Sequence, residues 1–244
     1  MILDNDIEIL DGLEIAYIRT LDYIVATDLH LGYEDVMGSS GILIPKASLK
    51  MIKDKIQRAY DRFKPKGIIV TGDIKNEFSE VSLGEFNELY EFIRFLKDLS
   101  LDMIFIKGNH DNFIDRYKDA FKFKSYDQYV KIDRYLFTHG DVDLDISDID
   151  TIIMGHEHPA VTIYTKVGAK RKYKCFLYGR CNKHRILVLP ALGYYSTGTD
   201  LNIIPKSQIL SPLLRRCNID KLHAILIDGN ESLDFGELGR LRYI

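Results

Sequence analysis

The sequence of 244 residues has few cysteines, no long apolar run and no excess of basic charge. Three cysteines are too few for a disulfide framework, and an odd count is typical of a reducing compartment. We therefore expect Cys175, Cys181 and Cys217 to be free thiols, buried or half-buried. No apolar run approaches the roughly 18 residues that a membrane-spanning helix needs. The formal net charge of −3 gives no global field that would attract nucleic acid.

The chain also lacks the usual signs of targeting and of division into domains. Its first residues are acidic, without a basic start followed by an apolar segment, so no signal peptide is expected. No internal repeat, low-complexity segment or linker rich in Pro, Gly and Ser is present. With 46% hydrophobic and 28% charged residues, the composition is ordinary for a globular protein. We expect a cytoplasmic protein with no membrane partner, folded as a single domain over residues 1–244.

The first half of the chain alternates strands and helices. Short apolar runs predict strands at residues 13–19, 23–27, 67–71 and 103–106. Helical spacing of apolar residues predicts helices at residues 45–63 and after a capping box formed by Ser82 and Glu85. Residues 31–45, between the second strand and the first helix, are expected to form a loop. This order favours parallel strands joined by helical crossovers.

Strands dominate after residue 128. We expect a pair of strands over residues 129–138, a buried strand at 151–154, and further strands at 160–166, 172–178, 185–189 and 221–227. Because helices no longer alternate with strands, the natural interpretation is a second, more antiparallel sheet built largely from residues 129–244.

Five polar motifs follow five apolar strands. They are Asp28-x-His30, Gly72-Asp73, Gly108-Asn109-His110-Asp111, His139-Gly140 and Gly155-His156-x-His158. Ligands of open α/β sheets bind beyond the carboxyl ends of the strands. These motifs hold five of the seven histidines, and histidines placed for packing alone would not collect in this way.

The donors in these motifs predict a centre for two metal ions. At a strand end, residues i and i+2 project to one side, so the Asp-x-His and His-x-His pairs can reach one ion. Two carboxylates, one amide and four imidazoles are too many for one tetrahedral zinc. They fit two ions bridged by a shared carboxylate, about 3.5–4 Å apart. The mixed oxygen and nitrogen donors, without thiolate, fit Mn²⁺, Fe, Ni²⁺ or Zn²⁺.

Such a centre would act on phosphate esters. Two ions can hold a phosphate and a hydroxide for in-line attack. The leaving alkoxide then needs a proton, which a histidine beside the metals can supply. His110 is the candidate general acid, and Asp111 could set the tautomer of that ring.

In order and spacing, these motifs resemble those of the calcineurin-like metallophosphoesterases, over residues 28–158. The resemblance implies an α/β fold, specifically a four-layer α/β/β/α sandwich, with a binuclear metal centre that prefers manganese. It implies that Asp28, His30 and His158 bind one metal ion, that Asn109, His139 and His156 bind the other, that Asp73 bridges the two, and that His110 is the general acid. The Asp28-Leu-His-Leu-Gly-Tyr33 stretch is most similar to the Mre11/SbcD nuclease branch, including small DNA-ligase-associated relatives. One departure is Lys75 and Asn76, where nuclease members carry an aromatic residue and then His or Asp.

These motifs leave three hypotheses about function. The first is a metal-dependent phosphodiesterase, with nucleic acid as one candidate substrate. The second is a phosphomonoesterase or cyclic-nucleotide phosphodiesterase on the same core. The third is a scaffold that has lost catalysis, which the complete set of ligand positions and the presence of His110 argue against. The sequence does not select the native metal or the oligomeric state.

Two further stretches have alternative interpretations. Residues 166–185 contain eight Lys or Arg and no acid, with aromatic residues interleaved. They could form a platform for nucleic acid or a solvated hairpin with its charges on one face. Residues 194–200, which begin with two tyrosines, could line a substrate cleft or simply turn the chain.

Overall fold

The first sheet places parallel strands at its centre. The computed structural model describes residues 1–76, 83–112, 114–145, 147–164 and 168–243. The strand order is β1-β2-β3-β4-β5-β6, with β3 to β6 parallel and β1 to β3 antiparallel. Their bounds are Ile7–Ile9, Ala16–Ile18, Tyr23–Ala26, Gly67–Thr71, Asp102–Ile106 and Lys124–Tyr126. Strands β3 and β4 are buried along their whole length, which explains why they appear in the sequence as continuous apolar runs.

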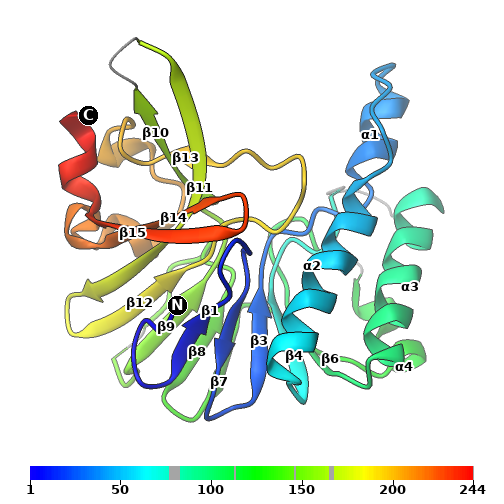
Figure 1. Ribbon diagram of the computed structural model, residues 1–244. Coiled ribbons are helices and arrows are strands. Elements are labelled where there is room, and N and C mark those ends of the chain that lie inside the picture. Colours follow the sequence, from blue (N-terminus) through cyan, green and yellow to red (C-terminus); the bar gives the residue numbers. More distant parts are fainter. Residues whose placement is uncertain (77–82, 113, 146, 165–167, 244) are drawn as a thin grey trace.

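Helices α2 (Ser48–Phe63) and α3 (Leu83–Asp98) cover one face of this sheet (Figure 1). Each buries one apolar stripe, which includes Ile52 and Ile56 on α2 and Leu89 and Ile93 on α3. The short η1 (Ile114–Tyr117) and α4 (Lys118–Phe121) precede β6. No helix in the described ranges has both the length and the apolar character needed to cross a membrane.

The second sheet is mixed, with antiparallel pairs around a parallel centre. Its main path is β13-β10-β11-β12-β9-β8-β7, and β14 pairs with β11 and β15. Strands β8, β9 and β12 are parallel neighbours, while β10, β11, β14 and β15 pair antiparallel. The bounds are Tyr129–Ile132 (β7), Tyr135–Thr138 (β8), Thr151–Met154 (β9), Pro159–Tyr164 (β10), Lys170–Cys181 (β11), His184–Val188 (β12), Thr199–Asp200 (β13), His223–Asp228 (β14) and Glu231–Glu237 (β15).

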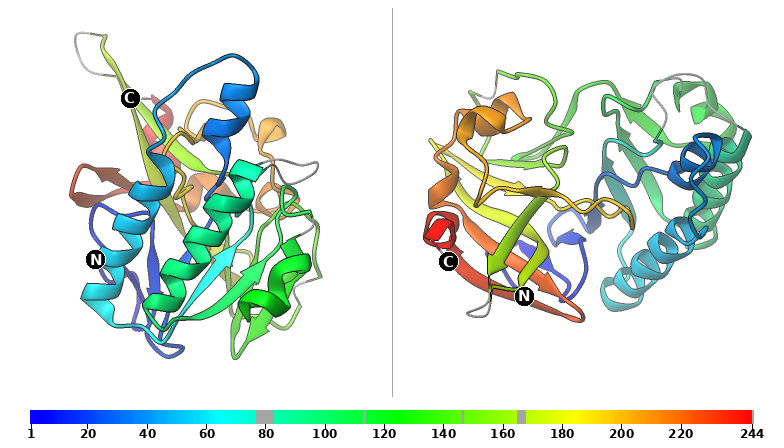
Figure 2. Two further views of the ribbon diagram at one scale, coloured as in Figure 1. Left: turned by 90° about the vertical axis from the view of Figure 1, so that its right-hand side faces the viewer. Right: turned by 90° about the horizontal axis from the view of Figure 1, so that it is seen from above.

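Three apolar cores separate four layers. One core lies between α2, α3 and the first sheet, and a second lies between the two sheets, where Phe137 and Phe176 pack with Val25 and Ile69. The third covers the outer face of the second sheet with α5 (Pro212–Arg215) and the short helices η2 (Lys206–Gln208), η3 (Ile219–Lys221) and η4 (Leu238–Tyr243). The views in Figure 2 show the two sheets between these outer layers. The predicted α/β/β/α sandwich is confirmed.

The loop expected at residues 31–45 contains a helix, α1 (Tyr33–Ser39). Its buried Glu34 accepts hydrogen bonds from the backbone of Ala47 and Ser48, where α2 begins. Glu34 thereby satisfies N–H groups that the start of a helix leaves without partners. This capping from another helix replaces the start near Pro45 that the sequence predicted. Of the predicted capping box, Ser82 lies outside the described residues, and Glu85 accepts from the backbone of Asn76.

The prediction of free cysteines was wrong for two of the three. Cys181 and Cys217 form a disulfide with a Cα–Cα distance of 4.9 Å, and Cys175 is a buried free thiol. The bond joins the end of β11 to the turn after α5, two segments 36 residues apart. Such a closed loop is expected to stabilise the fold by about 2–4 kcal/mol, through the entropy it removes from the unfolded chain. The odd count alone could not show which cysteines the fold brings together.

Thiol counting tests this pairing. Denatured, unreduced protein should react with one equivalent of a thiol reagent, and reduction should raise the count to three. The Cys175→Ser variant is the control, because its count before reduction should fall to zero. Three reactive thiols in unreduced wild-type protein, alkylated at lysis, would contradict the disulfide.

Candidate metal centre

All five polar motifs meet at the carboxyl ends of strands from both sheets. The motifs that contain Asp28, Asp73 and Asn109 follow β3, β4 and β5, respectively. The motifs that contain His139 and His156 follow β8 and β9. The Asp28 N–H donates to the Gly72 carbonyl at 3.0 Å, and the His156 N–H donates to Asp28 Oδ2 at 3.1 Å. The second of these bonds links the two sheets directly at the site.

Asp28, His30, Asp73 and His158 form the first group that could hold a metal ion. One ligand atom from each lies within 4.8 Å of the others. His158 Nε2 lies 3.1 Å from Asp28 Oδ1 and 3.4 Å from His30 Nε2. Asp28 is fully buried, and its Oδ1 atom faces His158 Nε2, which forms an ion pair with it only when that ring is protonated. A buried carboxylate oxygen in this condition is costly unless a cation or a proton meets it.

Asp73, His139 and His156 form the second group. His139 Nε2 lies 3.4 Å from Asp73 Oδ2 and 3.1 Å from His156 Nδ1. Asn109 Oδ1 lies 3.3 Å from the same His139 nitrogen. The structure therefore brings together all seven predicted ligand residues, and Asp73 belongs to both groups.

The ring of His139 shows why this arrangement fits a cation. Its Nδ1 donates to the carbonyl of Thr71 at 2.9 Å, which leaves a lone pair on Nε2 of the neutral ring. That lone pair faces Asn109 Oδ1, a second acceptor, and lies near the ring nitrogen His156 Nδ1. Two acceptors that face one another need a proton or a metal ion between them. The donor set, with oxygen and imidazole nitrogen and no thiolate, fits a divalent transition metal.

The pKa values show the same shortage of positive charge. Burial would lower the pKa of His139, but its hydrogen bond to Asp73 and the charge of Asp28 raise it to about 10. Burial and the neighbouring His139 lower the pKa of His156 to about 4. Asp28 also raises the pKa of His158 against the effect of burial, so the carboxylates draw protons onto their imidazole neighbours. A bound divalent cation would replace such a proton, as ligand deprotonation usually accompanies metal binding.

The candidate ligand side chains are not directed by the alternation of residues i and i+2 that the sequence predicted. Asp28, His30, Asp73, His156 and His158 all have positive φ, between 46° and 66°. They lie past the strand ends in left-handed turns, so each turn, and not the pleat of a strand, directs its side chain. Such backbones cost about 1–3 kcal/mol each and persist where the surrounding structure fixes them, often at active sites.

Glycines in three motifs make room for these side chains. An added Cβ at Gly72 would lie 2.3 Å from His139 Nδ1, and one at Gly108 would lie 2.2 Å from Asp73 Oδ1. At Gly155 it would lie 1.8 Å from Thr27 Oγ1. The glycines are therefore required by close approach, and Gly72 also by its φ of +94°.

His110 lies beside the centre but belongs to neither ligand group. Its Nε2 is 3.8 Å from Asp73 Oδ2, and its Nδ1 is 2.5 Å from the backbone carbonyl of Asn76. The expected partner, Asp111, instead accepts hydrogen bonds from the backbone N–H groups of Ile74, Lys75 and Gly108. The fold thus orients His110 through a carbonyl and uses Asp111 to hold two motif loops together.

Thr27 is a residue that the sequence analysis missed. Its buried hydroxyl lies 2.9 Å from Asp28 Oδ2 and 3.0 Å from the carbonyl of Thr71. It therefore orients a candidate ligand from behind. A signal was present, because a threonine also precedes the Gly72-Asp73 motif and the His139-Gly140 motif, as Thr71 and Thr138.

Residues 166 and 167 of the basic stretch lie outside the described residues, and the described part, residues 168–185, is largely paired within the protein. Lys170 and Lys172 pair with Asp200, Arg171 with Asp228, and Arg185 with Asp4. Lys183 donates to the carbonyl of Ser147, and Lys174 pairs with Glu14. These contacts favour the hairpin interpretation over a platform for a polyanion.

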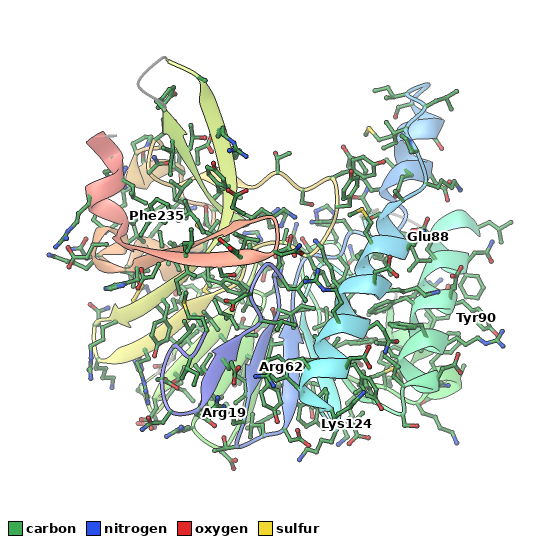
Figure 3. All side chains as sticks on the ribbon, viewed as in Figure 1. Arg19, Arg62, Glu88, Tyr90, Lys124 and Phe235 are labelled. Atoms are coloured by element: carbon green, nitrogen blue, oxygen red, sulfur yellow. A yellow bond between two sulfur atoms is a disulfide. The ribbon has the colours of Figure 1, made fainter. Side chains whose placement is uncertain are left out.

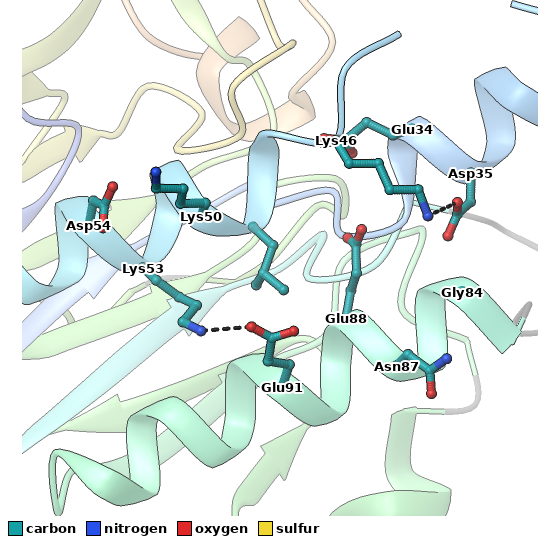
Figure 4. A pocket seen from close by; sticks show the side chains of 11 residues that line it. Glu34, Asp35, Lys46, Lys50, Lys53, Asp54, Gly84, Asn87, Glu88 and Glu91 are labelled. Carbon is teal, nitrogen blue, oxygen red and sulfur yellow. Dashed lines mark hydrogen bonds and ion pairs between the residues drawn. The ribbon is translucent and has the colours of Figure 1, made fainter. Parts of the chain in front are cut away.

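A cavity of about 620 Å³ lies between α1, α2 and α3. Figure 4 shows its charged lining, with Lys46 paired to Asp35 and Lys53 paired to Glu91. Burial, together with Glu34 and Asp35, raises the pKa of Glu88 there. None of the seven candidate ligands lines this cavity. The candidate metal centre is therefore at the sheet edge and is separate from the cavity.

The close packing at Gly108 gives a direct test of the site. Gly108→Ala should weaken Mn²⁺ binding by about 10-fold to 100-fold, because the new methyl group displaces Asp73. Gly38→Ala on α1 is the matched control, since nothing lies within 4 Å of its added Cβ. Titration calorimetry measures both, with urea unfolding to show that each variant is folded. Unchanged Mn²⁺ affinity in folded Gly108→Ala would contradict the assignment of Asp73.

Comparisons with known proteins agree with this geometry. The calcineurin-like phosphoesterase family matches residues 21–160. The crystal structure of Pseudomonas putida nuclease MPE is similar in fold, with a TM-score of 0.65 and 14% identity over 93% of this chain and 94% of that one. The Yfce phosphoesterase from E. coli aligns with a TM-score of only 0.43 and 14% identity, over 86% and 95% of the two chains. A search among curated proteins finds no match. The family match covers more than half of the chain and contains every candidate ligand, so the chain belongs to the calcineurin-like phosphoesterase family and is a metal-dependent phosphoesterase.

Proposed function

We propose that this protein is a phosphodiesterase that uses two divalent metal ions, manganese by resemblance, with His110 as general acid. The observation that carries the proposal is the carboxylate of Asp73, which belongs to both ligand groups. A shared carboxylate is how two ions are held about 3.5–4 Å apart. In this assignment one ion is bound by Asp28, His30 and His158, and the other by Asn109, His139 and His156.

The residues of the chain provide orientation and proton transfer. When bound, the ions would neutralise charge on the phosphate oxygens and activate a water molecule. Thr27 and the Thr71 carbonyl fix the orientations of Asp28 and His139. His110 donates Nδ1–H to the Asn76 carbonyl and, when protonated, presents Nε2–H toward the space beside Asp73. From there it can protonate a leaving oxygen. Because His110 is not a candidate metal ligand, this proton transfer takes no ligand away from the metal ions.

A dedicated proton donor assists an alkoxide leaving group, whether the substrate is a diester or a monoester. One observation favours a diester. The similar fold over 93% of this chain belongs to a protein named as a nuclease. Together with the resemblance of Asp28–Tyr33 to the Mre11/SbcD branch, this supports the proposal of a single-domain enzyme with nucleic acid as the candidate substrate. The cytoplasmic location expected from composition stays a prediction.

Substrate preference tests the proposed reaction. With Mn²⁺, wild-type protein should hydrolyse bis(p-nitrophenyl) phosphate faster than p-nitrophenyl phosphate, and His139→Ala should lose both activities. Fe²⁺, Ni²⁺ and Zn²⁺ are compared in parallel. A preference for the monoester would replace the proposal with a phosphomonoesterase, and absence of turnover with all four metals would support the scaffold hypothesis.

The general-acid role has its own signature. His110→Ala should lower kcat for a dinucleotide with an alkoxide leaving group by about 10²-fold to 10⁴-fold. Turnover of bis(p-nitrophenyl) phosphate should fall far less, because nitrophenolate leaves without a proton, and Mn²⁺ affinity should be unchanged. His223→Ala is the control, because that exposed ring pairs with Asp234 on the outer β14–β15 hairpin. Equal losses on the two substrates would argue against proton donation by His110.

A further inference from the structure

Residues 191–195 run from the second sheet to the first, across the carboxyl end of β3 (Figures 1 and 2). The N–H of Leu192 donates to the Thr27 carbonyl and the N–H of Gly193 donates to the Asp28 carbonyl, each at 2.9 Å. An added Cβ at Gly193 would lie 2.9 Å from the Leu29 carbonyl oxygen. This segment is therefore packed directly against a backbone that carries a candidate metal ligand.

A half-buried lysine contacts the same segment from the other side. Lys174 on β11 donates to the carbonyls of Ala191 and Gly193, at 2.7 and 2.8 Å. Its charge is balanced by Glu14, 3.6 Å away, which also pairs with Lys55. The segment is thus held by backbone bonds on one side and by a charged donor on the other, and the next residues of the chain extend from a rigid base.

Three tyrosines, which we call the tyrosine cluster, gather next to this base. Tyr195 stacks on Tyr33 with ring centroids 5.4 Å apart, and Tyr194 meets Tyr195 edge-on at 4.9 Å. Tyr33 follows His30 closely, and its N–H donates to the His30 carbonyl at 3.3 Å. Tyr194 comes directly after Gly193, one residue step of about 3.8 Å from the Asp28 contact. Tyr33 therefore follows the backbone that carries His30, and Tyr194 follows a segment that is hydrogen-bonded to the backbone of Asp28.

The members of the cluster have different roles. Tyr195 also donates its hydroxyl to the Pro45 carbonyl at 2.5 Å, so Tyr195 and Tyr33 hold the segments before and after α1 together. Tyr194 is 46% exposed. An aromatic ring that is open to solvent, on a segment hydrogen-bonded to the Asp28 backbone, offers a stacking surface for a flat ligand group.

We propose that the tyrosine cluster, through the exposed ring of Tyr194, binds an unpaired nucleobase next to the scissile phosphate of single-stranded nucleic acid. This inference rests on the proposed phosphodiesterase function and adds the class of substrate. Aromatic side chains bind bases of any sequence by stacking, because every base has a π-face. A base within a duplex is already stacked on its neighbours, so only an unpaired base can offer that face. Most of the described basic residues of the β10–β11 hairpin have partners within the protein, so the proposed stacking contact does not depend on them.

Two phosphodiesters that differ only in the presence of a base provide the test. They are the p-nitrophenyl ester of thymidine 5′-phosphate and methyl p-nitrophenyl phosphate, compared with Mn²⁺ present. Tyr194→Ala should raise KM for the thymidine ester by about 5-fold to 100-fold, with kcat nearly unchanged. The methyl ester should be hydrolysed as by wild type, and Tyr194→Phe should restore the wild-type KM.

Tyr90→Ala is the matched control. Tyr90 is 45% exposed and lies on the outer side of α3, away from this segment (Figure 3). The control variant should leave both substrates unchanged. Equal effects of Tyr194→Ala on the two esters, or no effect on either, would overturn the stacking role while leaving the phosphodiesterase assignment intact.

Failure of the proposed function would look different. In that case wild-type protein would hydrolyse neither ester with any of the four metals. The tyrosine cluster is then judged by fluorescence anisotropy with a labelled oligothymidylate of eight nucleotides. Weaker binding by Tyr194→Ala than by Tyr90→Ala would support the base site, and equal binding by the two variants would overturn it.

Discussion

The carboxylates of Asp28 and Asp73 lie close together in a buried place, and much of this structure depends on how their charge is met. Asp28 is 0% exposed and Asp73 is 3% exposed, and ligand atoms of the two lie within 4.8 Å of each other. Two like charges at that distance repel by about 3 kcal/mol at an effective dielectric constant near 20. The histidines around them reduce this repulsion only by taking up protons, as the raised pKa of His139 shows. Divalent cations bound between the two carboxylates would attract both of them and so outweigh their mutual repulsion.

The two-sheet architecture is what allows this arrangement to persist. Left-handed backbones at five candidate ligands oppose folding. They are offset by the apolar core between the sheets, where Phe137 and Phe176 are fully buried. A fully buried side chain of this size contributes about 1.5–3 kcal/mol. Because Asp28 and Asp73 come from one sheet and His139 and His156 from the other, packing of the sheets and assembly of the site are a single event.

The sequence was informative where chemistry-bearing residues end apolar strands. Asp28, Asp73 and His139 could be identified in this way, because strand ends in an α/β sheet meet at one edge. A second sheet could be predicted because alternating strands and helices give way to strands alone, whereas the four-layer sandwich was what the family resemblance implied. The direction of the ligand side chains could not be predicted, since left-handed turns at Asp28 and His158 depend on contacts with other motifs.

Features that depend on a distant partner were missed for the same reason. Helix α1 is held by Glu34, whose partners are backbone groups at the start of α2. Cys181 finds Cys217 only because β11 and α5 pack together. Lys174 belongs to a basic run in the sequence, but in the structure it is a half-buried donor to the segment before Tyr194. In each case one residue's role is set by a tertiary contact that no local pattern records.

The central claim is that Asp73 bridges two metal ions. The most direct measurement is a crystal structure of the Mn²⁺-loaded protein with anomalous diffraction data collected at the manganese edge. If Asp73 bridges two ions, two anomalous peaks should lie about 3.5–4 Å apart, with the Asp73 carboxylate between them. Asp28 should lie next to one peak and His139 next to the other. A single peak at full Mn²⁺ loading, or two peaks that do not share Asp73, would contradict this claim.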